Sequence, residues 1–152
     1  MTTRLENVHI LCVDDEESVL EYLARTFSYA DAVVIPAGTL EEARRVLKDR
    51  DVDFAIVDLV LGEGARGEDL EEDLQRIAIP HVYLTGYDTR PEEIGVSVPV
   101  WYKTGLHGLS FLTRVLDEMR KQQDSLVADR EFPSAHIGFC PERKREVAHL
   151  VR

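Results

Sequence analysis

The chain has 152 residues, a hydrophobic fraction of 44% and a formal net charge of −11. This length suffices for one compact domain with a core and some surplus, and the hydrophobic fraction excludes a disordered chain. The negative charge argues against non-specific DNA binding, which depends on the neutralisation of phosphates. No apolar run approaches the length of a membrane span, and residues 1–6 lack the apolar core of a signal peptide. We therefore expect a soluble, cytoplasmic protein.

The charge is unevenly distributed along the chain. Residues 1–120 hold 12 basic and 24 acidic residues, a net charge of −12, whereas residues 121–152 hold 6 and 5, a net charge of +1. This change predicts a boundary between a main domain, residues 5–122, and a C-terminal extension, residues 123–152. The two cysteines lie far apart and outside any ligand spacing, so we expect neither a disulfide nor a structural metal site.

Apolar runs that alternate with amphipathic stretches predict the elements in chain order. A first buried strand spans residues 8–13 and leads through four acidic residues into a helix. A second strand, residues 32–35, is closed by Pro36. Thr39 then predicts the N-cap of a second helix, with Glu42 completing a capping box. The apolar faces of these two helices are formed by Val19, Leu20, Leu23, Phe27, Leu40, Ala43, Val46 and Leu47.

The middle of the chain repeats this alternation. Asp51 and Asp53 indicate a turn, and the third strand, residues 54–57, is a short apolar run typical of a central strand buried on both faces. The glycine-rich loop that follows, residues 62–67, lacks the ending of a phosphate-binding P-loop. A third helix leads to the fourth strand, residues 79–84. We interpret His81 in this segment as a strand-start residue rather than a catalytic group. The apolar face of the third helix consists of Leu70, Leu74 and Ile77.

The last third of the chain begins with an irregular segment. Residues 87–98 leave room for no more than a turn or two of helix, because Pro91 and Gly95 interrupt them. The fifth strand, residues 98–102, carries Pro99 near its start, which suggests an edge position. The last helix is expected from near residue 106, with an apolar stripe of Leu109, Leu112, Val115, Leu116 and Met119 that continues toward Leu126 and Val127.

Five strand–helix repeats predict a doubly wound α/β fold, in which helices cover both faces of a five-stranded parallel sheet. Four of the strands end in polar residues of complementary kinds, namely Asp14 and Asp15, Asp58, Thr85, and Lys103. Because the carboxyl ends of parallel strands meet at one edge of the sheet, we expect these side chains to converge there.

The converging residues suit phosphoryl transfer. Asp58 offers a carboxylate that can attack phosphorus and form an aspartyl phosphate. Its carboxylate and the two adjacent carboxylates Asp14 and Asp15 make an oxygen site suited to Mg²⁺. Such an ion and the fixed cation of Lys103 would neutralise the phosphoryl charge, and Thr85 offers a hydroxyl donor. Each of these five residues alone has a plain structural explanation as a strand-end or helix-start residue, but their presence at four strand ends together favours this chemistry.

The segments Asp14-Asp15, Ile56-Val57-Asp58, Leu84-Thr85-Gly86 and Tyr102-Lys103 resemble the response-regulator receiver domains of two-component signalling. The resemblance covers residues 5–122 and implies a (βα)₅ flavodoxin-like fold. It further implies that Asp58 is the phosphoacceptor and that Lys103 pairs with the phosphoryl group. By the same resemblance, Thr85, next to Gly86, senses the phosphate, and Mg²⁺ or Mn²⁺ is bound by Asp14, Asp15, Asp58 and the main-chain carbonyl of Val60.

The chain also departs from the pattern of that family. The family lysine is usually followed by proline, where this chain has Thr104, and the switch aromatic usually lies at the position of Val100. Trp101 and Tyr102 are close, but strand alternation directs Trp101 to the face opposite Val100. The segment of the fourth helix is also shortened. We therefore expect phosphorylation to be retained while its output takes a different route.

The resemblance implies specific partners. The phosphodonor would be a phosphohistidine on a sensor histidine kinase or a histidine phosphotransfer protein, and output would occur through contact with a further protein. A homodimer is one possible state, and neither direct DNA binding nor membrane association is expected. Self-phosphorylation and dephosphorylation would be the only catalysis.

Two alternatives remain open from the sequence. One is a pseudo-receiver that binds partners without phosphorylation. The other is a phosphatase of the haloacid-dehalogenase type, which is disfavoured because Val60 stands where that family has its second acid. The extension is too short for the usual DNA-binding output domain. Its apolar patch at residues 136–141 favours a partly helical docking tail over a disordered one.

Overall fold

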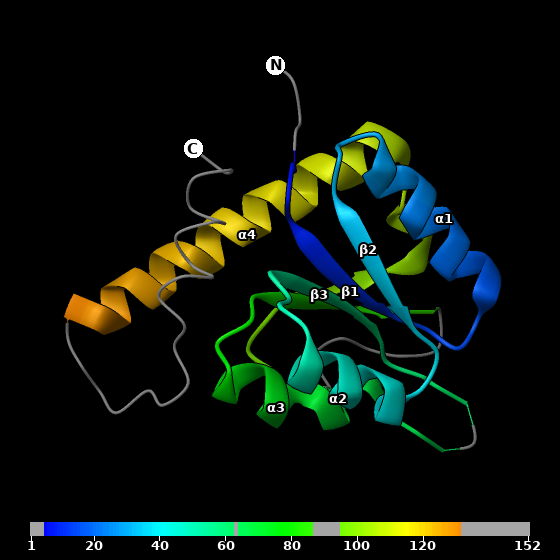
Figure 1. The fold of residues 1–152 in the computed structure, drawn as a ribbon, viewed down its shortest axis with the longest axis horizontal. Helices are drawn as coiled ribbons and strands as arrows, with labels where there is room; N and C mark the ends of the chain where they lie inside the picture. Colours follow the sequence, from blue (N-terminus) through cyan, green and yellow to red (C-terminus); the bar gives the residue numbers. More distant parts are fainter. Residues whose placement is uncertain (1–4, 63, 87–94, 132–152) are drawn as a thin grey trace.

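The computed structural model describes residues 5–62, 64–86 and 95–131 (Figure 1). A five-stranded parallel sheet in the order β2-β1-β3-β4-β5 forms its centre, which confirms the predicted doubly wound α/β architecture. The strands are β1 (His9–Val13), β2 (Val33–Ala37), β3 (Phe54–Asp58), β4 (His81–Thr85) and β5 (Val100–Tyr102). The helices are α1 (Glu17–Ser28), α2 (Leu40–Asp49), α3 (Glu71–Arg76) and α4 (Gly108–Glu131), with single 3₁₀ turns η1 (Gly67–Leu70) and η3 (Lys103–Gly105).

The helices cover the two faces of the sheet in pairs. Helices α1 and α4 pack on one face, where Phe27 and Phe111 lie in a core cluster with Ile10 and Ile56. Helices α2 and α3 pack on the other face, where Leu74 belongs to a second cluster. The central strand β3 is buried over its whole length between β1 and β4, as its unbroken apolar run predicts. Its C-terminal residue Asp58 therefore lies at the middle of the sheet edge.

Two prolines mark the two edge strands. Pro99 directly precedes β5. This strand lies at one edge of the sheet, which confirms the edge position predicted for it. The prediction that Pro36 closes the second strand is wrong, because β2 continues through Pro36, paired with Cys12, to Ala37. Since β2 is the other edge strand, it has only one neighbour and tolerates a residue without an N–H group.

Asp53 corrects a second prediction. It is a buried residue rather than a plain turn residue, and its carboxylate accepts a hydrogen bond of 2.8 Å from the N–H of His9. The N–H of Asp53 donates in return to the carbonyl of His9 at 2.8 Å. This reciprocal pair joins the starts of β1 and β3, and a partner 44 residues away leaves no local sequence signal. Asp51 is exposed.

The helix starts and stripes follow the sequence with one exception. The Thr39 hydroxyl accepts the Glu42 N–H at 3.1 Å, and the Glu42 carboxylate accepts the Gly38 N–H at 2.8 Å, so the predicted cap is confirmed. In α4, however, Leu109 is 67% exposed and is not part of the core stripe. The buried stripe passes through Phe111, Val115 and Met119, and at about 100° per residue Leu109 lies roughly 100° from the centre of that stripe, outside the buried face.

Helix α4 continues without interruption past residue 122 to Glu131, as its apolar pattern predicts. The shortened helix predicted between the fourth and fifth strands, which is not α4, falls largely on residues 87–94, and the docking tail falls largely on residues 132–152. Both ranges lie outside the described residues, so these two stay predictions, as does the domain boundary at residue 122. Within the described part of the chain, no helix combines the length and apolar character that crossing a membrane requires.

Candidate functional site

Three carboxylates meet at the C-terminal edge of the sheet. Asp14 and Asp15 follow β1, Asp58 ends β3, and one carboxylate oxygen of each lies within 4.8 Å of the others. Asp14 and Asp58 are only 1% and 4% exposed, whereas Asp15 is exposed. Asp14 is fixed by its Oδ1, which accepts the Glu16 N–H at 2.8 Å. The convergence expected from the parallel topology is therefore present in the structure.

Lys103 brings a cation to these carboxylates. It follows β5 in the turn η3, and its Nζ lies 3.0 Å from Asp58 Oδ2 and 3.0 Å from Asp14 Oδ2. Glu16 Oε1 is a more distant neighbour at 3.6 Å. Both contacts are ion pairs in a half-buried site, and the one with Asp58 also has the geometry of a charge-assisted hydrogen bond. Lys103 is thus held between two strands that it does not adjoin in the sheet.

The pKa values show that one lysine does not balance the buried acids. Burial and the neighbouring charge of Asp14 raise the pKa of Asp58 to about 6, against the opposing effect of Lys103. Burial likewise raises the pKa of Asp14. The pKa of Lys103 lies above its usual range, because the hydrogen bonds and charges of both carboxylates outweigh the effect of burial. Burial is thus the main cause of the raised pKa values of both carboxyl groups, and Lys103 offsets it only in part.

This donor set fits a hard divalent cation. Carboxylate oxygens are the ligands that Mg²⁺ and Mn²⁺ prefer, and the three here come from two neighbouring strands held in fixed register. A divalent ion would also add positive charge beside Asp14 and Asp58, whose charged forms are disfavoured by burial.

Thr85 and Gly86 lie at the same edge. Thr85 is the last residue of β4 and is fully buried, with its hydroxyl directed to the carbonyl of Gly86 at 3.3 Å. The residue before it, Leu84, pairs in register with Asp58 and accepts the Leu59 N–H at 2.9 Å. The hydroxyl predicted to sense phosphate is therefore one residue beyond the strand position that faces the candidate phosphoacceptor.

The loop after Asp58 folds back tightly. The Val60 N–H donates to Asp58 Oδ1 at 3.3 Å, and the Gly67 N–H donates to the carbonyl of Leu59 at 2.9 Å. A Cβ added to Gly67 would lie 2.0 Å from the main-chain oxygen of Asp58, so only glycine fits this close approach. The sequence shows the glycine-rich loop but not this contact, which supports the backbone of the candidate phosphoacceptor.

Strand β5 places its side chains as the alternation predicts. Val100 packs in the cluster under α2 and α3, whereas Trp101 packs in the cluster under α1 and α4, where its ring meets Phe111 at 6.2 Å. Tyr102 and Thr104 are exposed. None of the peptide bonds in the described residues is cis. Trp101 is therefore separated from the face of Val100, the position at which the family usually carries its switch aromatic.

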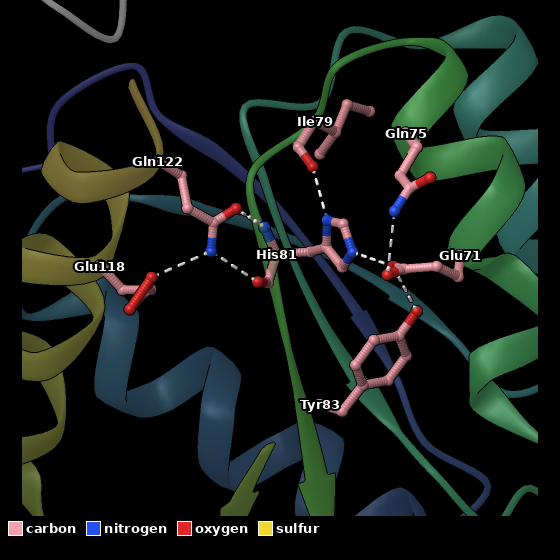
Figure 2. Close-up of polar contacts among 7 residues, drawn as sticks. All are labelled: Glu71, Gln75, Ile79, His81, Tyr83, Glu118 and Gln122. Atoms are coloured by element: carbon pink, nitrogen blue, oxygen red, sulfur yellow. Dashed lines mark hydrogen bonds and ion pairs between the residues drawn. The ribbon is translucent and has the colours of Figure 1, made fainter. Parts of the chain in front are cut away.

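A second polar cluster lies at the opposite end of β4 (Figure 2). The ring of His81 contacts the carbonyl of Ile79 through Nδ1 at 2.6 Å and the carboxylate of Glu71 through Nε2, and Tyr83 donates to that carboxylate at 3.0 Å. Gln122 of α4 accepts the His81 N–H at 2.9 Å and donates to the His81 carbonyl at 2.8 Å. His81 is the first residue of β4, which confirms its interpretation as a strand-start residue.

This cluster fastens three elements together. Burial acts to raise the pKa of Glu71, but hydrogen bonds from His81 and Tyr83 outweigh it and lower that pKa below its usual value. The His81 ring is held on both sides, since one nitrogen faces the carbonyl of Ile79 and the other faces the carboxylate of Glu71. Glu71 on α3 and Gln122 on α4 are therefore both tied to the start of β4, a link that the sequence does not reveal.

Two of three comparisons with known proteins found similar proteins, one by sequence and one by structure. No protein-family model matches the chain. Over 79 residues it is 30% identical to the response regulator SaeR of Staphylococcus aureus, a match that covers 51% of this chain and 34% of that protein. The chain thus spans about a third of the length of the curated relatives it matches.

Solved structures extend the likeness. A CheY-like receiver domain protein from Methanospirillum hungatei has a TM-score of 0.67 at 18% identity, over 79% of this chain and 99% of that chain. SdrG from Sphingomonas melonis has a TM-score of 0.63 at 24% identity, over 75% and 97%. A response regulator from Burkholderia pseudomallei, solved with a phosphorylated aspartic acid, a calcium ion and citrate, has a TM-score of 0.59 at 22% identity, over 81% and 75%. The chain has the fold of response-regulator receiver domains.

Proposed function

We propose that this chain, with its receiver fold, accepts a phosphoryl group on Asp58 from a phosphohistidine donor in a cytoplasmic two-component phosphorelay. One observation carries the proposal: the buried Asp58 carboxylate lies 3.0 Å from Lys103 Nζ and within one cluster with the carboxylates of Asp14 and Asp15. A buried nucleophile, a fixed cation and a set of metal-ligand oxygens are the parts that phosphoryl transfer to a carboxylate needs.

The side chains divide the work of the transfer. A carboxylate oxygen of Asp58 forms the new bond to phosphorus while the bond from phosphorus to the donor imidazole nitrogen breaks, and that nitrogen keeps the electron pair. Lys103 neutralises charge on the phosphoryl oxygens, and the Thr85 hydroxyl donates to one of them. Mg²⁺, when held by the three aspartates and the main-chain carbonyl of Val60, supplies further positive charge against the phosphoryl oxygens.

Two further observations support this assignment. The raised pKa values of Asp14 and Asp58 indicate a site that gains from added positive charge. The Burkholderia pseudomallei response regulator carries a phosphorylated aspartic acid and a cation on the same fold. By analogy with receivers, a sensor histidine kinase or a histidine phosphotransfer protein would be the donor, and output would occur through binding of a partner protein.

The test is intact mass after incubation with acetyl phosphate and Mg²⁺. We expect one added phosphoryl group on the natural chain and none on Asp58→Asn or after chelation of the metal. Asp49→Asn, which changes an exposed carboxylate on α2, is the matched control and should behave as the natural chain.

A negative result is resolved with beryllofluoride, which mimics the phosphoryl group. Spectral changes on its addition, without a lasting adduct, would indicate fast hydrolysis of the aspartyl phosphate. No adduct and no response to beryllofluoride would contradict the proposal and favour the pseudo-receiver. Sustained turnover of a phosphomonoester that depends on Asp58 would instead favour the phosphatase.

A further inference from the structure

Tyr22 connects helix α1 to the loop that carries Lys103. Its hydroxyl donates to the main-chain carbonyl of Leu106 at 2.5 Å, across 84 residues of sequence. The same hydroxyl oxygen accepts the N–H of Gly108, the first residue of α4, at 3.5 Å. One side chain thus contacts the loop between β5 and α4 at two main-chain positions.

The contact lies close to the candidate phosphorylation site. Tyr22 and Lys103 line one small hollow of about 200 Å³ between α1 and the loop, together with Ser18, Val19 and Leu106. Leu106 is three residues after Lys103, beyond the single turn η3, and its side chain is buried in the core cluster. A shift of the loop at Leu106 would therefore be passed through one short turn to the lysine.

We propose that Tyr22 is a positioning residue, which fixes the loop so that the Lys103 ammonium remains between Asp14 and Asp58. A lysine side chain has four rotatable bonds, and two contacts of 3.0 Å at its tip define its place only while its backbone is also fixed. The side chain of Leu106 anchors the loop to the core on one side, and the Tyr22 hydroxyl anchors its carbonyl to α1 on the other. The consequence for phosphorylation rests on the function proposed above.

The position of Tyr22 is consistent with this role. The residue is 37% exposed, so its hydroxyl could hydrogen-bond to water at little cost, and yet it bonds to the loop. A helix tyrosine that only covers the core needs its ring and not its hydroxyl. Tyr22→Phe keeps the ring and removes only the contact to Leu106 and Gly108. Tyr29→Phe removes a hydroxyl from an 80% exposed tyrosine directly after α1 and is the matched control.

The first measurement is the reactivity of the Lys103 amine with a dilute acylating reagent, followed by peptide mass spectrometry. Loss of the hydroxyl's two contacts, of which the short one to Leu106 is the stronger, should increase the acylation rate of Lys103 about three- to tenfold in Tyr22→Phe, and Tyr29→Phe should leave it unchanged. Lys48 and Lys121, both on the surface, are internal standards. The denaturation midpoint should remain close to that of the natural chain. An unchanged rate at Lys103 in Tyr22→Phe would overturn the proposal, whatever the function of the protein.

The second measurement is the rate of phosphorylation by acetyl phosphate with Mg²⁺. Tyr22→Phe should slow it about three- to tenfold, and Tyr29→Phe should not change it. Added to Lys103→Met, Tyr22→Phe should have no further effect, because Tyr22 acts through that lysine. Additive losses would overturn the positioning role. If the natural chain shows neither a phosphoryl adduct nor a response to beryllofluoride, the proposed function fails, and the acylation rates still decide the role of Tyr22.

Discussion

Replacement of Gly67 by alanine tests how the loop supports Asp58. A Cβ at this position would meet the main-chain oxygen of Asp58 at 2.0 Å, its carbonyl carbon at 2.9 Å and Val57 Cγ1 at 2.8 Å. Ordinary contacts begin at 3.4 Å, so the loop and the strand end must separate by more than 1 Å. Two of the three clashes involve main-chain atoms of the candidate phosphoacceptor, which is held by β3 and cannot rotate away as a side chain can.

The expected cost is that of an overpacked core, about 1–3 kcal/mol in the free energy of unfolding. The backbone of Gly67 is not in the left-handed region, so alanine adds steric strain without a penalty from φ. For a chain of this size we expect the melting temperature to fall by about 2–12 °C. Displacement of the Asp58 carbonyl should also reduce phosphorylation by acetyl phosphate.

Chemical denaturation with and without Mg²⁺ measures the effect. Gly95→Ala is the matched control, because a Cβ there meets no atom of the described residues within 4 Å, and its unfolding free energy should stay within about 0.5 kcal/mol of that of the natural chain. If Gly67→Ala is as stable as Gly95→Ala and is phosphorylated normally, the loop does not support Asp58 as argued.

Three further predictions concern charge and packing. Asp58→Asn should stabilise the metal-free protein at neutral pH by about 1–3 kcal/mol, because the raised pKa of Asp58 makes the folded state lose stability as the pH rises from about 4 to about 6. Saturating Mg²⁺ should remove this advantage, and a lower melting temperature for Asp58→Asn in chelator would contradict it. Because the pKa of Glu71 is lowered, its ionised carboxylate stabilises the fold above the unfolded pKa near 4.5, and this stabilisation is lost as the pH falls. The free energy of unfolding of Glu71→Gln should therefore decrease less steeply at acid pH than that of the natural chain, whereas the exposed Glu72→Gln should not change this slope. Phe111→Ala, which removes a fully buried ring packed on two aromatic neighbours, should cost about 3–5 kcal/mol by denaturation, and a cost under about 1 kcal/mol would contradict the packing described.

Much of the fold could be predicted because its signals are local. The period of the apolar residues distinguishes strands from helices, Thr39 with Glu42 specifies a helix start, and the unbroken apolar run before Asp58 indicates a strand covered on both faces. Two of the predictions that failed depended on a segment elsewhere in the chain: Pro36 stays in its strand because β2 lies at an edge, and Asp53 is buried because it pairs with His9. The third, Leu109, failed because the buried stripe of α4 passes through Phe111 instead.

The candidate site divides in the same way. The sequence by itself determined which groups meet, because parallel strands place their carboxyl ends at one edge, so Asp14, Asp58 and Lys103 had to converge once the alternation of strands and helices was recognised. Only the tertiary structure decided what holds them in place. The hydroxyl of Tyr22 reaches a carbonyl 84 residues away, and Gly67 lies against the backbone of Asp58. Such contacts depend on distances between segments that the chain brings together only when it folds, and no periodicity or motif encodes them.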